Sequence, residues 1–220
     1  MWNTSVRFAR FWGLQSAVVF GVMLGILLLP VALKAQSGSS VKKVEEDWEL
    51  VLNEPSPGNA APQVTCSISP LNHFDGVYAA LELNHGTLPG YTAGGLQLQA
   101  WNGESWLTVR DYDNTTLQNT GEVVTWTSRM VLNDGLLTFR VVNGNSTSWG
   151  AFGSGGNIKL SLNTSLSNLN LYSPDLTASH SGIGFGSQRV QSLKLKKVRY
   201  YDGSGNLISE DTTPRVVHQQ

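Results

Sequence analysis

Beyond residue 36, the sequence is a succession of short apolar runs separated by turn-forming residues. Apolar side chains in this part do not repeat at the 3.6-residue period of a helix, whereas β-branched and aromatic residues recur in short strand-like runs. Pairs such as Asn102-Gly103 and Asp202-Gly203 supply the left-handed conformations that tight turns need. The pattern predicts an all-β fold, an antiparallel two-sheet sandwich of the jelly-roll type. Strands are expected at residues 48–52, 63–68, 77–83, 95–101, 105–110, 122–132, 136–142, 146–152, 158–162, 169–172, 183–185 and 190–201.

The first 35 residues have the features of an export segment. Arg7 and Arg10 precede an uncharged apolar stretch at residues 17–33, and residues 32–35 offer an imperfect cleavage region. As a helix the stretch would span about 25 Å, slightly less than the roughly 30 Å hydrocarbon core of a bilayer. We expect a hydrophobic helix that is either a cleaved signal peptide, which is favoured, or an uncleaved signal anchor. In both cases residues 1–35 are the only membrane contact, and the remainder is exported.

One domain is expected to follow the export segment. A Ser/Gly linker at residues 36–44 leads to the sandwich at residues 45–211, and the tail at residues 212–220 is expected to fray. All 16 Asp and Glu but only 12 of the 15 Lys and Arg lie after residue 35, so the exported part carries a net charge of −4. An anionic domain rich in Asn, Ser and Thr suits the periplasm, the surface or the surroundings of a bacterial cell.

The composition argues against several classes of function. Charged residues make up 14% of the chain and the formal net charge is −1, so no basic surface for a nucleic acid is expected. The one cysteine, Cys66, excludes a disulfide framework and a multi-cysteine zinc site. The four histidines show neither metal-ligand spacing nor a triad-like arrangement. We therefore predict no metal and no cofactor; a calcium site at Asp111 and Asp113 is the alternative to an ordinary Asx-rich loop there. The alternation of residues 63–68 places Cys66 in the core.

Three segments carry a resemblance to a known fold family. Residues 181–186 (SGIGFG) and 192–202 (SLKLKKVRYYD) resemble the closing strands of concanavalin A-like lectin/glucanase domains, including the laminin-G type. The opening residues 47–51 (DWELV) are similar to the first strand of such domains, whose termini lie side by side. The resemblance covers residues 44–211 and implies a concanavalin-like sandwich. Such domains bind polysaccharides, glycoproteins or proteins, and some hydrolyse glycans, so the family implies a fold more than an activity.

The opening strand also contains a catalytic-looking spacing. Glu45, Asp47 and Glu49 have the Glu-x-Asp-x-Glu order that resembles the catalytic signature of laminarinase-type glucanases. In that family the signature lies in mid-chain, whereas here it opens the domain next to a linker. We interpret it as a solvated acidic segment.

A predicted hairpin carries the candidate ligand-binding residues. A two-residue turn at Asn102-Gly103 pairs Trp101 with Glu104 and gives the flanking strands two faces. The core face is expected to hold Leu96, Leu98, Ala100, Ser105, Leu107 and Val109. The other face is expected to hold the site residues Gln97, Gln99, Trp101, Glu104 and Trp106. Indole rings that stack on the C–H faces of a pyranose, beside amides that bind its hydroxyls, are typical of a sugar platform. Alternatively, both indoles cover the sheet beneath a loop.

These observations favour an exported, non-catalytic module that binds a polysaccharide or glycoconjugate at the cell envelope. One alternative is a glycan hydrolase or lyase that uses Glu82 and Glu104, which requires two carboxyl groups roughly 5–9.5 Å apart. A second alternative is a structural or adhesive envelope protein whose sandwich binds another protein.

Overall fold

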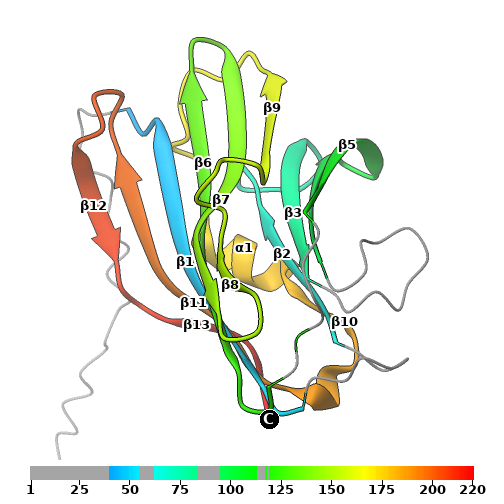
Figure 1. Ribbon diagram of the computed structural model, residues 1–220. Coiled ribbons are helices and arrows are strands. Elements are labelled where there is room, and N and C mark those ends of the chain that lie inside the picture. The colour runs from blue at the N-terminus through cyan, green and yellow to red at the C-terminus, as the bar shows by residue number, and fades with distance from the viewer. Residues whose placement is uncertain (1–39, 55–61, 84–94, 113–116, 118) are drawn as a thin grey trace, which may run out of the picture. The chain divides into compact units, whose positions relative to one another are not determined.

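A computed structural model of the chain describes residues 40–54, 62–83, 95–112, 117 and 119–220. The predicted hydrophobic helix and residues 36–39 of the predicted linker therefore lie outside the described residues, whereas Lys43 and Val44 of that linker belong to the first strand. The described part is an all-β antiparallel sandwich of two sheets with one short α-helix (Figure 1), as the strand pattern predicts. No helix in this part is long and apolar enough to cross a membrane.

The larger sheet has eight strands and contains both ends of the domain. Its main path runs through β12 (Leu207–Asp211), β11 (Val190–Tyr201), β1 (Lys43–Leu52), β6 (Val123–Asn133), β7 (Leu136–Ser146) and β8 (Gly150–Phe152). Two further strands complete it, β13 (Arg215–Gln219) beside β11 and β9 (Lys159–Asn163) beside β7. The opening strand β1 pairs directly with β11, so the two ends of the domain lie side by side (Figure 1).

The smaller sheet has five strands and follows the chain more simply. In spatial order its strands are β10 (Gly182–Phe185), β2 (Gln63–Ile68), β3 (Val77–Leu83), β4 (Leu96–Asn102) and β5 (Ser105–Tyr112). Each strand alternates between a core face and an outer face, because successive side chains of a strand point in opposite directions. In β4, for example, Leu96, Leu98 and Ala100 are buried in the apolar core shared with the larger sheet.

Two tryptophans anchor the core of the larger sheet. Trp48 of β1 and Trp126 of β6 are direct cross-strand partners, and their rings stack with centroids 6.1 Å apart and planes 5° from parallel. Both are almost fully buried, at 1% and 2% exposure. The indole of Trp48 donates to Oε2 of Glu46 at 3.0 Å, and that of Trp126 donates to Oγ of Ser128 at 3.2 Å. The pair therefore buries a large apolar area without leaving an indole N–H unpaired.

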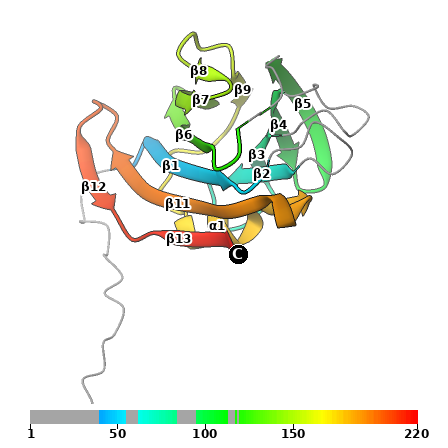
Figure 2. The same ribbon diagram turned by 60° about the horizontal axis from the view of Figure 1, so that its bottom comes forward.

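Two parts of the chain differ from the prediction. Residues 169–172 form a turn that buries Leu169 and Tyr172, and helix α1 (Pro174–His180) follows, capped by the Ser173 side chain. The helix packs against β2, β11 and β13 (Figure 2). The predicted fraying of the tail is wrong for residues 215–219, which form β13 on the edge of β11. Arg215 holds that strand in place through Asp211 and Asp175.

Cys66 lies in the core, as the alternation of β2 predicts, and is 3% exposed. Burial and the nearby carboxyl groups of Glu46 and Glu82 raise the pKa of its thiol. Because the thiolate is the reactive form, we expect thiol reagents to label native protein far more slowly than protein unfolded in denaturant. Labelling followed by mass spectrometry measures both rates. Equal rates would show that the Cys66 thiol is accessible in the native fold.

Candidate functional site

The predicted hairpin forms, but its turn lies one residue further along the chain. Asn102 pairs with Ser105, and Gly103 and Glu104 make the turn. Gly103 takes a left-handed φ of 55°, and its N–H donates to the carbonyl of Gly76 at 3.0 Å. This hydrogen bond to the residue before β3 holds Gly103 inside the turn. The pairing of Trp101 with Glu104 is therefore wrong, and Trp101 instead pairs with Trp106.

A bulge then reverses the two faces of β5 (Ser105–Tyr112) beyond Leu107 relative to the prediction. After the Trp101–Trp106 pair, Ala100 pairs with Thr108, so Leu107 has no partner in the ladder. Leu107 is 41% exposed, and Val109 pairs with Gln99. The predicted core positions of Leu107 and Val109 are thus wrong.

The outer face of the smaller sheet brings most of the predicted site residues together. Cross-strand pairing aligns the side chains of this face in three rows across β2 to β5. The first row is Thr65, Glu82, Gln97 and Asp111; the second is Ser67, Ala80, Gln99 and Val109; the third is Tyr78, Trp101 and Trp106. We call these side chains the outer polar face. Glu104 is not part of it, because it lies exposed in the turn.

A chain of hydrogen bonds links the polar side chains of this face. Trp101 Nε1 donates to Gln99 Oε1 at 2.9 Å, and Gln99 Nε2 donates to Gln97 Oε1 at 2.6 Å. Gln97 Nε2 in turn donates to Asp111 Oδ1 at 2.7 Å. Both glutamine side chains are buried. The chain orders donors and acceptors along β4, next to the indole of Trp106, which is 57% exposed.

Glu82 lies in the first row, next to Gln97. Burial raises its pKa to about 7, even though the Thr65 hydroxyl donates to both of its oxygens at 2.8 Å. Near neutral pH this carboxyl group can therefore either donate or accept a hydrogen bond. Because Glu82 lies opposite Gln97, its distance from Glu104 can be counted along β4. The strand extends five residues beyond Gln97, to Asn102, and Glu104 follows in the turn. Glu82 and Glu104 are thus at least about 17 Å apart along the strand, beyond the carboxyl separation of a glycosidase.

An aromatic cluster at the edge of this face was not expected from the sequence. The His180 ring stacks on Phe74 with centroids 3.7 Å apart and meets Tyr78 edge-on at 5.5 Å. Its Nδ1 is 3.1 Å from the Ser67 hydroxyl, and burial lowers the pKa of the imidazole. His180 itself remains exposed, so the cluster lies at the surface. Only the alternation of β3, which places Tyr78 opposite Trp101, could have indicated this cluster.

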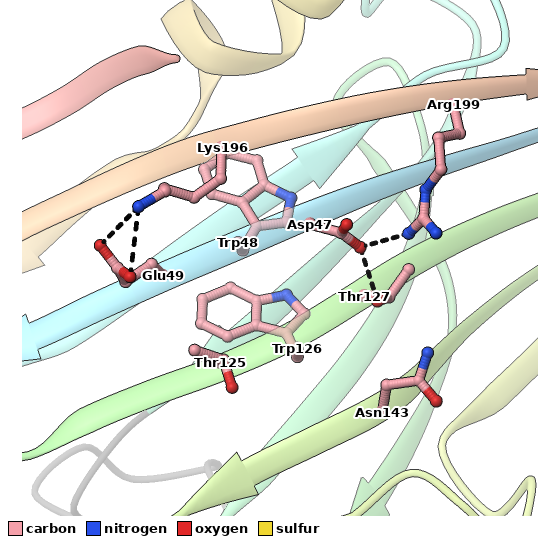
Figure 3. Close-up of a pocket in the computed structure, with 9 residues that line it drawn as sticks. All are labelled: Asp47, Trp48, Glu49, Thr125, Trp126, Thr127, Asn143, Lys196 and Arg199. Carbon is pink, nitrogen blue, oxygen red and sulfur yellow. Dashed lines mark hydrogen bonds and ion pairs between the residues drawn. The ribbon is translucent and has the colours of Figure 1, made fainter. Parts of the chain in front are cut away.

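A depression of about 380 Å³ lies on the outer face of the larger sheet (Figure 3). Two bulges flank it, one in β11 at Lys196 and one in β7 near Asn143, and the Trp48–Trp126 pair lies between them. Lys196 reaches Glu49 at 3.3 Å, while Asp47 accepts from Arg199 at 2.6 Å and from Thr127 at 2.8 Å (Figure 3). The charged groups that line the depression thus pair with one another.

The Glu-x-Asp-x-Glu spacing belongs to this second face. Burial alone would raise the pKa of Glu45, but a hydrogen bond from Tyr201 and the charges of Arg129, Lys43 and Arg199 hold it below its ordinary value. A catalytic acid needs a raised pKa, so these contacts favour ion pairing. Glu45 is only 5% exposed, and Glu46 points the other way into the core and is fully buried, so the expected solvated acidic segment is wrong at both residues.

Comparison with known proteins identifies no family for this chain, so a functional assignment depends on the geometry described above. No family model matches the sequence, and searches of curated proteins and of solved structures give no match.

Proposed function

We propose that the chain is a non-catalytic module that binds a polysaccharide or glycoconjugate on the outer polar face. The observation that carries this proposal is the hydrogen-bonded chain from Trp101 through Gln99 and Gln97 to Asp111, beside the exposed indole of Trp106. Exposed indoles stack on the apolar faces of sugar rings, and fixed amides and carboxylates bind the hydroxyl groups. Since the amides are already oriented, a ligand would lose little side-chain entropy on binding.

The proposal includes the fold family and the location of the domain. A concanavalin-like sandwich is consistent with two antiparallel sheets whose first and last long strands pair. Export rests on the sequence alone, through Arg7, Arg10 and the apolar stretch at residues 17–33. The domain would then meet glycans in the envelope or outside the cell.

Binding accounts for this face better than hydrolysis by Glu82 and Glu104 does. The ladder separates these two carboxyl groups by more than a sugar-cleaving pair allows. The wild-type chain should therefore release no reducing ends from a polysaccharide that it binds. Release by the wild type but not by Glu82→Gln would contradict the non-catalytic assignment.

Trp106→Ala should weaken retention on a bound polysaccharide by about fivefold to tenfold, because a stacked ring contributes on the order of 1 kcal/mol or slightly more. Affinity electrophoresis of the full-length chain in gels that contain a panel of polysaccharides measures this effect. The matched control is Leu207→Ala, which removes a side chain of similar exposure, 55% against 57%, from the other sheet. Equal retention of both variants, or a hit with a protein partner but no glycan, would contradict the proposal.

A further inference from the structure

One row of side chains crosses five strands of the outer face of the larger sheet. Ladder pairing places Arg199 opposite Glu45, Glu45 opposite Arg129, Arg129 opposite Arg140, and Arg140 opposite Lys159. Side chains opposite one another in a ladder point to the same face. The row therefore runs through β11, β1, β6, β7 and β9, and its last three positions are all cations.

The carboxylates are concentrated at one end of this row. Glu45 contacts Nε of Arg129 at 2.6 Å and NH2 of Arg199 at 3.6 Å, so both guanidinium groups have an acidic neighbour. Among the described residues, no carboxylate pairs with Arg140 or Lys159. Nε of Arg140 is buried without a hydrogen-bond partner, as is Nε of Arg199 at the other end of the row.

This arrangement costs stability in the free protein. Like charges directly opposite one another in a ladder destabilise a sheet, and Arg140 has a cation on both sides. A buried N–H without a partner adds a further cost. An anionic group bound between Arg140 and its neighbours would offset the repulsion between these cations.

We propose that Arg129, Arg140 and Lys159, which we call the basic row, bind carboxylate groups of an acidic polysaccharide. This surface goes beyond the function proposed above, because it lies on the other sheet. Guanidinium groups bind carboxylates through paired, charge-assisted hydrogen bonds. The chain would then have two glycan-binding faces with different chemistry, one built from indoles and amides and one from cations.

The surroundings of the basic row fit a single polymer chain. Strands β6, β7 and β9 contain no Asp or Glu, and Thr138 and Ser161, two positions along the β7–β9 ladder from Arg140 and Lys159, add hydroxyl groups to the same face. A flat anionic bilayer would also meet the carboxylates of Glu45, Asp47 and Glu49 on β1. A polysaccharide chain can follow the three acid-free strands, which are spaced about 4.8 Å apart, without meeting those carboxylates.

Polygalacturonate binding by the full-length chain in a neutral polyoxyethylene detergent tests this proposal. Wild type should bind polygalacturonate, more weakly as salt rises, and should not bind the fully methyl-esterified polymer, which has the same backbone without the charge. Arg140→Gln should weaken binding about tenfold, and Arg140→Gln with Lys159→Gln should abolish it. The matched control, Arg110→Gln, removes an exposed cation from the other sheet and should change binding less than about twofold.

The outcomes separate this proposal from the previous one. Trp106→Ala should keep its affinity for polygalacturonate, because Trp106 lies on the other sheet. Equal losses in Arg140→Gln and Arg110→Gln, equal binding of the esterified polymer, or no binding by the wild type would each overturn the basic row. Arg140-dependent binding of soluble dihexanoylphosphatidylglycerol without binding of polygalacturonate would assign the surface to a lipid headgroup and would also overturn it.

Discussion

Trp48→Ala is expected to lower the free energy of unfolding by about 3–5 kcal/mol, as large-to-small changes of buried aromatic residues do. Trp48 is 1% exposed and stacks on Trp126, so its removal leaves a cavity between β1 and β6. The change also removes the N–H that donates to Glu46 at 3.0 Å, inside the core. Denaturant titration followed by circular dichroism measures the loss.

Trp106→Ala is the matched control for this prediction. The same change at the 57% exposed Trp106 should cost no more than about 0.5 kcal/mol, because little packing is lost at the surface. Similar losses in the two variants would contradict the division between buried and exposed indoles. Trp48→Phe should recover part of the loss, since a phenyl ring fills part of the cavity but cannot donate to Glu46.

The unfolding free energy should fall as pH rises from about 4.5 to about 7, because of Glu46 and Glu82. Burial raises the pKa of Glu46 from 4.5 to about 7, although Tyr172 donates to it at 2.7 Å. Between these values the unfolded chain releases the proton and the folded chain keeps it, so ionisation favours unfolding. The shift corresponds to a stability loss on the order of 3 kcal/mol.

Glu46→Gln should remove this share of the pH dependence. Urea titrations at pH 5 and pH 8 should show that the variant loses on the order of 3 kcal/mol less stability across the interval than wild type does. Burial also raises the pKa of Glu82 to about 7. Glu82 therefore contributes to the same pH dependence, and Glu82→Gln should remove that contribution. A profile for Glu46→Gln that parallels the wild type would show that Glu46 titrates normally in the fold.

At lower pH, by contrast, the free energy of unfolding should fall as the pH falls. Burial alone would raise the pKa values of Glu122 and Asp211, but hydrogen bonds from Ser146 and Ser148 to Glu122, and from Thr213 and Arg215 to Asp211, hold them below their ordinary values. The stability that these carboxylates contribute is present above their unfolded pKa values and is lost as pH falls through the folded ones. Because ionisation of Glu46 and Glu82 lowers the stability above about pH 4.5, the protein should be most stable at about pH 5.

The sequence predicted best where one local rule decides the structure. Period-two alternation placed Leu96 and Leu98 of β4 in the core and put Gln97 and Gln99 on the opposite face. The same rule placed Cys66 in the core. These predictions succeed because the direction of a side chain along a regular strand depends only on its position.

Features that depend on contacts between distant segments were not predicted. The N–H of Gly103 in the turn donates to the carbonyl of Gly76, and Leu107 is bulged out of the ladder between β4 and β5. The burial of Glu46 depends on Tyr172, which is 126 residues away. The basic row is equally hidden, because Arg129, Arg140 and Lys159 meet only when three strands pair in register.

The outer polar face as a glycan-binding surface is tested most directly by ¹⁹F NMR of the full-length chain labelled with 5-fluorotryptophan. Trp→Phe variants assign the resonances, and the titrant is an oligosaccharide of the polysaccharide that the chain binds best in affinity gels. The resonances of Trp101 and Trp106 should shift on titration, whereas those of the buried Trp48 and Trp126 should not. Saturable binding that leaves Trp101 and Trp106 unchanged would contradict the account.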